Sequence, residues 1–151
     1  MSSRLFSEVR EKRGLAYMVR AGSDSFRDTG MVQIQSGLDP ARLGEAFKVI
    51  KDELKKIKKE KVSKKELFDA KNNLIGHLTL ALEDSSTQAQ MAARDLIFLG
   101  KVEKYQEICK KIKAVTEDKI IRLAQKLFDE KKMYLAVISP FSKKEVLKCL
   151  K

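Results

Sequence analysis

The residues most able to do chemistry are Arg10 and Tyr17, which lie seven positions apart near the start of the chain. A guanidinium carries five N–H donors, and a phenol carries one O–H donor. Gly14, between them, is the residue type that commonly ends a helix in the left-handed conformation. We therefore expect a tight corner at Gly14, across which Arg10 and Tyr17 face each other and donate hydrogen bonds into the same space.

The residues before Gly14 have the pattern of a short helix. Its apolar side chains are three and four positions apart and so share one face; they are Leu5, Phe6 and Val9. Ser2 or Ser3 can cap the helix, because a serine hydroxyl accepts a hydrogen bond from an unpaired backbone N–H. The last turn is basic, which suits the helix dipole; these residues are Arg10, Lys12 and Arg13. After Gly14, the apolar stretch 15–21 predicts a strand.

The next stretch predicts the return of an antiparallel hairpin. Residues 30–37 alternate between polar and apolar, as in a half-buried strand, and residues 22–29 supply turn-forming side chains. Asp39 and Pro40 then mark the start of a helix that continues to about Lys59. Aspartate caps a helix, and proline fits the first helical position because its missing N–H would be unpaired there anyway.

The remaining sequence predicts more helices and one more strand. Helices are expected at about residues 64–83, 85–99, 105–113, 117–128 and 141–151. We expect Ser85 or Ser86 to cap the helix at 85–99, which is apolar on several sides and should be well buried. The apolar run 133–138 predicts a central strand. The sequence thus predicts an α+β fold, with helices covering an antiparallel sheet, in a single domain that spans residues 1–151.

Composition excludes several classes of protein. The 151 residues, 43% of them hydrophobic, are enough to form a folded core. No apolar run is long enough to cross a membrane, so we expect no membrane-spanning segment. The start of the chain lacks the charged and apolar regions of a signal peptide, so we do not expect a signal peptide either. His77 is the only histidine, which excludes any zinc motif that needs two histidines in this chain. Cys109 and Cys149 are expected to be reduced thiols, as in a cytosolic protein.

The net charge of +11 raises the question of an acidic partner. The most basic run, residues 55–65, contains no aromatic residue or glycine and crosses the expected end of a helix. We interpret it as a solvated surface, because most lysines of the chain lie in helices that also carry glutamate. Binding of nucleic acid through this run is the alternative.

The whole chain resembles one homology unit of the pitrilysin/insulinase (inverzincin) family of zinc metallopeptidases, which includes the mitochondrial processing peptidases. The resemblance is carried by four stretches in the same order and spacing; they are MSSRLFSEVREKRGLAY (1–17), FRDTGMVQIQSGLDP (26–40), VSKKELFDAKNNLIGHLTLALEDSSTQAQ (62–90) and KAVTEDKIIRLAQKLFDEKKMYLAVISP (113–140). The first of them resembles the signature of the C-terminal, non-zinc half of the family.

The resemblance implies roles for Arg10 and Tyr17. In the family, one half carries an H-x-x-E-H helix that binds zinc, and the other half closes over the peptide. That second half supplies an arginine and, seven residues later, a tyrosine, which match Arg10 and Tyr17. By this resemblance, both donate hydrogen bonds to the substrate at its scissile carbonyl, as that carbonyl becomes an oxyanion. The alternative interpretation is that Arg10 is a surface charge that complements the helix dipole and Tyr17 is a core residue of its strand.

The resemblance also implies a cofactor and partners. The chain has no H-x-x-E-H motif. We therefore expect it to be inactive alone and to bind no metal or cofactor, with zinc held by a partner half on the same chain or on another subunit. That half and a peptide substrate are the expected partners, and neither a membrane nor nucleic acid is expected. The expected location is the cytoplasm.

In the family, a strand, a helix and a glycine-rich turn precede the position that Met1 takes here. We expect that the first strand and helix of the unit are missing, that the sheet has an open edge, and that the isolated chain self-associates through this edge. Two other functions stay open. One is a scaffold or core subunit that has lost catalysis, which a zinc motif in the other half would exclude. The other is a basic nucleic-acid-binding module, which binding that weakens steeply with salt would support.

Overall fold

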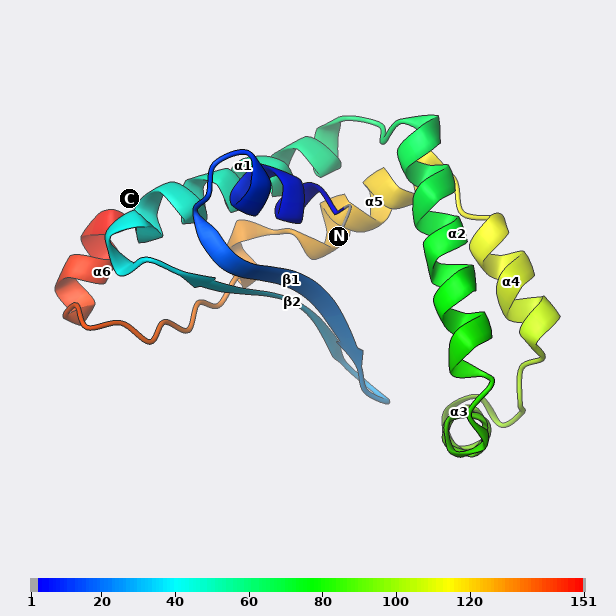
Figure 1. Cartoon of the computed structure of the whole chain (residues 1–151). Coiled ribbons are helices and arrows are strands. Elements are labelled where there is room, and N and C mark those ends of the chain that lie inside the picture. The colour runs from blue at the N-terminus through cyan, green and yellow to red at the C-terminus, as the bar shows by residue number, and fades with distance from the viewer. Residues whose placement is uncertain (1–2, 151) are drawn as a thin grey trace. The chain divides into compact units, whose positions relative to one another are not determined.

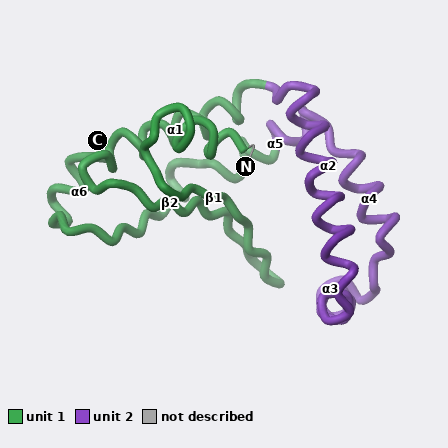
Figure 2. The backbone as a smooth tube through the Cα atoms, viewed as in Figure 1, with its two compact units in different colours: residues 1–60, 123–151 green, residues 61–122 purple. Residues whose placement is uncertain are grey.

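The structure is a computed structural model that describes residues 3–150. The chain forms two compact units, residues 1–60 with 123–151 and residues 61–122 (Figure 2). One two-stranded antiparallel sheet is combined with helices, so the predicted α+β class is confirmed (Figure 1). The prediction of a single domain stays a prediction, since two compact units can belong to one domain.

The first unit starts with a short helix and a β-hairpin. The helix η1 (Phe6–Glu11) is a π-helix, and the Ser3 hydroxyl accepts a hydrogen bond from the Phe6 N–H at 3.2 Å, as predicted. Ser2, the other candidate cap, lies outside the described residues. Strand β1 (Ala16–Ser25) and strand β2 (Gly30–Leu38) follow, joined by a short turn. The predicted hairpin is confirmed, and its first strand begins one residue later and ends four residues later than expected.

The hairpin contains a β-bulge at Tyr17. The register between the strands shifts between Ala16 and Met18, so that β1 has one extra residue at this point. Ala16 and Val19 are both buried, although their spacing would place them on opposite faces of a regular strand. The bulge resolves this conflict because the extra residue lets both side chains turn toward the core.

The hydrophobic core of this unit lies where η1, the hairpin and the helix α1 (Leu43–Lys59) meet. Its buried members are Val9, Leu15, Ala16, Val19 and Ala46. Half-buried side chains pack around them; these are Leu5, Phe6, Ile34, Leu38, Val49 and Ile50. The core therefore fixes the orientation of η1 and β1, the two elements that carry Arg10 and Tyr17.

The other helices of the first unit include the predicted start at Pro40. A short 3₁₀-helix, η2 (Pro40–Arg42), leads into α1, and the Asp39 side chain caps it by accepting a hydrogen bond from the Ala41 N–H at 2.9 Å. Near the C-terminus lie η3 (Glu130–Lys132) and α6 (Lys143–Cys149), and α6 contacts α1.

The second unit is helical. Its elements are α2 (Lys64–Ala81), α3 (Ser85–Leu99), α4 (Tyr105–Lys113) and the first part of α5 (Glu117–Leu127), which continues into the first unit. Helices α2 and α4 pack together, and a hydrogen bond of 2.8 Å joins the Thr79 and Tyr105 hydroxyls.

Two expectations about α3 are wrong. Its cap is Asp84, not Ser85 or Ser86, because the Asp84 carboxylate accepts hydrogen bonds from both the N–H and the hydroxyl of Thr87, at 2.7 and 2.6 Å. The helix is also not well buried: the apolar side chains of its last turn, residues 96–99, are each at least 51% exposed. Apolar residues are spread around α3, and only one side of it packs.

The predicted strand at 133–138 is also wrong. These residues form no strand in the structure, and Tyr134 and Ile138 are almost fully exposed (Figure 1). Regular β-structure requires a neighbouring strand for its backbone hydrogen bonds. Within the described residues, the sheet contains only β1 and β2, so this apolar run has no strand beside it.

Candidate functional site

Arg10 and Tyr17 lie on either side of a corner that two backbone hydrogen bonds close. The Gly14 N–H donates to the Arg10 carbonyl at 2.9 Å, and the Leu15 N–H donates to the Val9 carbonyl at 2.8 Å. Gly14 has a φ of +57°, the left-handed conformation that the sequence predicts. Because other residue types adopt this conformation only with strain, glycine allows the chain to reverse here within a few residues.

The helix before the corner is wider than the sequence indicates. The Lys12 N–H donates to the Ser7 carbonyl, five residues earlier, at 2.9 Å. This i to i−5 bond defines a π-turn, which is rare and is frequently found at functional sites. The wider turn changes the direction in which the following side chains leave the helix.

Each of the two candidate residues directly follows a buried residue in the sequence. Val9, before Arg10, is 0% exposed, and Ala16, before Tyr17, is 5% exposed. Arg10 itself is exposed, and Tyr17 is 75% exposed. The interpretation of Tyr17 as a core residue is therefore wrong. The buried neighbours hold the backbone in place, and the bulge turns the Tyr17 ring outward.

The side chain of Arg10 lies on its own helix. Its guanidinium carbon is 4.9 Å from the centre of the Phe6 ring, a cation–π arrangement. Among the described residues, no hydrogen bond joins the side chains of Arg10 and Tyr17. The corner thus holds their backbones near each other, while the two donor groups are presented separately at the surface.

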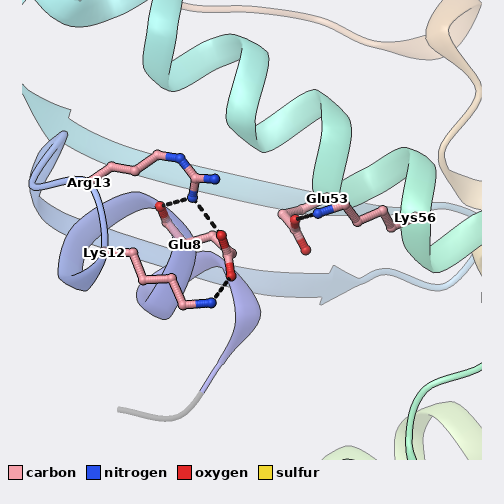
Figure 3. Close-up of polar contacts among 5 residues, drawn as sticks. All are labelled: Glu8, Lys12, Arg13, Glu53 and Lys56. Carbon is pink, nitrogen blue, oxygen red and sulfur yellow. Dashed lines mark hydrogen bonds and ion pairs between the residues drawn. The ribbon is translucent and has the colours of Figure 1, made fainter.

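The other basic residues of this turn are bound to Glu8 (Figure 3). The Glu8 carboxylate accepts hydrogen bonds from Arg13 and Lys12, each at 2.5 Å, and Arg13 also donates to the Glu8 backbone carbonyl at 2.7 Å. These contacts, with Arg13 as the strongest, lower the pKa of Glu8 from 4.5 to about 2. They also raise the pKa of Arg13 above its ordinary value. Lys12 and Arg13 are therefore occupied in holding the turn, so that of the three basic residues at positions 10–13 Arg10 is the one available to a ligand.

A second acidic side chain faces this turn from α1. Glu53 is 7% exposed and accepts a hydrogen bond from Lys56 at 2.6 Å (Figure 3). This contact raises the pKa of Lys56. The negative charge of Glu53 also contributes to the raised pKa of Arg13. The effect of Glu53 on the pKa of Arg13 is smaller than that of Glu8, which bonds to Arg13 directly.

Arg42 is a positioning residue that the sequence analysis did not identify. Its guanidinium donates to the backbone carbonyls of Gly14 at 3.1 Å and Arg13 at 3.3 Å, and it pairs with Glu45 at 3.2 Å. These bonds connect the start of α1 to the corner, although the partners are 28 and 29 residues apart in sequence. No local pattern marks such a contact, so sequence reasoning had no signal for it.

The described residues do not fit a zinc site. Among them, no group of three or more His, Cys, Asp or Glu side chains is arranged to hold a metal ion. The one histidine, His77, is exposed on α2. No catalytic step is therefore assigned to a metal bound by this chain. Among the described helices, none combines the length and the apolar character that a membrane span requires.

Comparison with known sequences points to one family. The family model described as "Peptidase M16 inactive domain" matches residues 1–74, a region that contains the corner. "Uncharacterized zinc protease YmxG" of Bacillus subtilis (strain 168) is 36% identical over 140 residues, which cover 93% of this chain and 34% of that protein. An uncharacterized zinc protease of Mycobacterium tuberculosis (strain H37Rv) is 33% identical over 147 residues, covering 97% of this chain and 33% of that protein. The chain thus spans about a third of the length of these relatives.

Two solved structures have a similar fold. A conserved protein from Enterococcus faecalis V583 gives a TM-score of 0.71 at 28% identity, covering 82% of this chain and 28% of that one. A chain of complex III2 from Candida albicans gives a TM-score of 0.73 at 20% identity, covering 83% and 30%. The second similarity shows the fold alone.

Proposed function

Because this chain belongs to the M16 (pitrilysin) family of peptidases, as an inactive C-terminal domain, we propose that it closes a peptide-binding chamber and donates hydrogen bonds to the substrate. The donors are Arg10 and Tyr17. The observation that carries this proposal is the corner at Gly14. The residue before each of them is buried and fixes the backbone, while the side chains of Arg10 and Tyr17 stay exposed.

The chemistry of the two donors fits a carbonyl that gains negative charge. When a nucleophile attacks a peptide carbonyl, its oxygen becomes an oxyanion, and fixed donors aimed at it lower the barrier. Removing one such donor typically costs on the order of 3 kcal/mol, or about 10²-fold in kcat. The packed core behind Arg10 and Tyr17 supplies the rigidity that this effect requires.

We infer that the zinc ion and the hydrolytic step belong to another half. Relatives at 36% and 33% identity are named zinc proteases, and this chain spans only about a third of their length. The described residues of this chain form no metal-binding cluster. The zinc-bearing half, on the same chain or on another subunit, would be the partner, with a peptide bound between the halves.

The first test removes the phenol hydroxyl. In the enzyme assembled from this chain and its zinc-bearing half, Tyr17→Phe should lower kcat for a fluorogenic peptide by about 10²-fold, with a smaller change in KM. Tyr134→Phe is the matched control, because Tyr134 is 96% exposed and lies outside the corner. An unchanged kcat in Tyr17→Phe would contradict the proposed role.

A second variant tests the guanidinium. Arg10→Lys keeps the positive charge but loses the planar set of donors, so it too should lower kcat. Arg27→Lys, at an exposed position in the hairpin turn, is the control. If Arg10→Lys and Arg27→Lys behave alike, Arg10 acts only as a surface charge.

We propose that the isolated chain self-associates, and that the contact is made by residues 133–138 and not by the edge of the sheet as the sequence analysis expects. This segment is apolar and exposed and lies in no strand, so its backbone groups can pair with another copy. Light scattering should give a mass above 17.2 kDa that rises with concentration. Val137→Pro, which removes a backbone donor, should reduce this association. A strictly monomeric mass at high concentration would contradict the proposal.

A further inference from the structure

Gly37 lies directly against the ring of Tyr17. A Cβ atom at position 37 would be 2.3 Å from the Cζ atom of Tyr17 and 2.4 Å from its hydroxyl oxygen. These distances are shorter than non-bonded atoms allow. The phenol therefore occupies the space that a side chain of residue 37 would take.

The ring lies on the face of the hairpin that points away from the core. Ile34 and Leu38 of β2 pack against the core, and successive side chains of a strand alternate between faces. Position 37 therefore points to the opposite face. One side of the Tyr17 ring rests on Gly37 there, while the side chain as a whole stays 75% exposed and open to a ligand.

We propose that Gly37 is a positioning residue for Tyr17. The bulge in β1 turns Tyr17 out of the regular alternation, and the missing side chain at Gly37 lets the ring lie along β2. Together, the two features hold the hydroxyl in one place, as a pre-organised donor requires. This inference rests on the proposed function of Tyr17 as a hydrogen-bond donor.

A side chain at position 37 would disturb Tyr17 and leave the fold intact. The backbone of Gly37 does not have a positive φ, so alanine fits the strand conformation. The atoms that a new Cβ would meet belong to the end of an exposed side chain, which can rotate away. Gly37→Ala should therefore displace the Tyr17 hydroxyl without unfolding the hairpin.

Gly22→Ala is the matched control. Gly22 lies in β1 opposite Gln33, and therefore on the same face as Gly37. A Cβ atom at position 22 would be 4.0 Å from its nearest neighbour, the Gln33 side chain, which is an ordinary contact. The control makes the same chemical change in the same hairpin without touching Tyr17.

The first experiment measures the ring position by NMR on this chain, without any activity. Ring currents should shift the Gly37 Hα signals upfield in the wild type and in Tyr17→Phe, and this shift should disappear in Tyr17→Leu. Gly37→Ala should move the Tyr17 ring signals, whereas Gly22→Ala should leave them in place. Gly37 signals that are the same in the wild type and in Tyr17→Leu would overturn the proposal.

The second experiment measures peptide cleavage by the assembled enzyme. Gly37→Ala should lower kcat by about the same factor as Tyr17→Phe, with a smaller change in KM, and Gly22→Ala should have no effect. The double variant Gly37→Ala/Tyr17→Phe should be no slower than Tyr17→Phe alone, because the hydroxyl that Gly37 positions is already absent.

The outcomes separate the two proposals. If Tyr17→Phe lowers kcat and Gly37→Ala does not, the role of Gly37 is overturned and that of Tyr17 stands. If Tyr17→Phe leaves kcat unchanged, the proposed function fails, and the ring-current measurement alone then decides whether Gly37 positions the ring.

Discussion

Two stretches of the first unit, residues 15–21 and 133–138, are both largely apolar and have different structures. The first lies largely in β1, and the second lies in no strand. Val19 in the first is 7% exposed, whereas Val137 in the second is 37% exposed and Ile138 is fully exposed. Both are rich in side chains that favour strands. They differ in what lies beside them, because a four-residue turn brings β2 alongside β1, whereas the described chain offers no strand to 133–138.

This difference shows that an apolar run becomes a strand only when its backbone is paired. A hairpin supplies the partner within a few residues of sequence. The run at 133–138 can obtain one only from another segment, which is the reason we propose that it pairs with a second copy in the isolated chain.

The largest difference between the two stretches should be in the rate of amide hydrogen exchange. The β1 amides that donate to β2 should exchange on the order of 10³-fold more slowly than free peptide, because exchange requires the hairpin to open. The amides of residues 134–137 should exchange at nearly the free rate in dilute samples. Protection of both stretches at low concentration would show that 133–138 is paired within one chain.

A pair of valine substitutions should separate the two regions energetically. Val9→Ala removes two buried methyl groups from the core behind Arg10 and should lower the free energy of unfolding by about 2 kcal/mol. Val137→Ala, at a partly exposed site, should change it by less than about 0.5 kcal/mol. Chemical denaturation measures both. Equal losses would mean that residues 133–138 also pack against a core.

Two glycine substitutions should change the free energy of unfolding in opposite directions. Gly14→Ala should lower the free energy of unfolding by about 1 kcal/mol, because Gly14 has a positive φ. Gly76→Ala, inside α2 with nothing within 4 Å of the added Cβ, should raise it by roughly 0.5–1 kcal/mol. Stabilisation by Gly14→Ala would show that the corner does not need the left-handed conformation.

The smallest expected effect is the contribution of Glu8 to the pH dependence of stability. The folded-state pKa of Glu8, about 2, is below its ordinary value of 4.5. Its contribution to stability is therefore fully present above pH 4.5 and is lost as the pH falls through about 2. Between pH 5 and pH 2, the wild type should lose more stability than Glu8→Gln.

Glu11→Gln, at an exposed position on the same helix, is the control for this measurement and should follow the wild type. Because the contacts of Glu8 are at the surface, added salt should also weaken its effect. Identical acid-unfolding curves for the wild type and Glu8→Gln would contradict the role of Glu8 in holding the turn.

Local features of the fold were predictable from sequence. The left-handed glycine at position 14, the cap at Asp39 and the hairpin turn each depend on a few neighbouring residues. The bond from Arg42 to the corner was not predictable, because its partners are 28 and 29 residues away. The unpaired state of 133–138 was missed for the same reason.

The candidate site was predictable in its residues and not in its geometry. The types and spacing of Arg10 and Tyr17 are visible in the sequence, and so is the glycine between them. The π-turn and the bulge that aim the side chains are not, because each inserts one residue into a regular pattern without a sequence signal of its own. The position of the Tyr17 ring against Gly37 depends on that bulge.

The most direct test of the central claim is a double-mutant cycle on Arg10 and Tyr17 in the assembled enzyme. If both donors act on the same carbonyl oxygen, the loss of kcat/KM in Arg10→Lys/Tyr17→Phe should differ clearly from the product of the two single losses. Losses that multiply without interaction would mean that the two residues act at separate places on the peptide, and would contradict the proposal that both donate to one carbonyl.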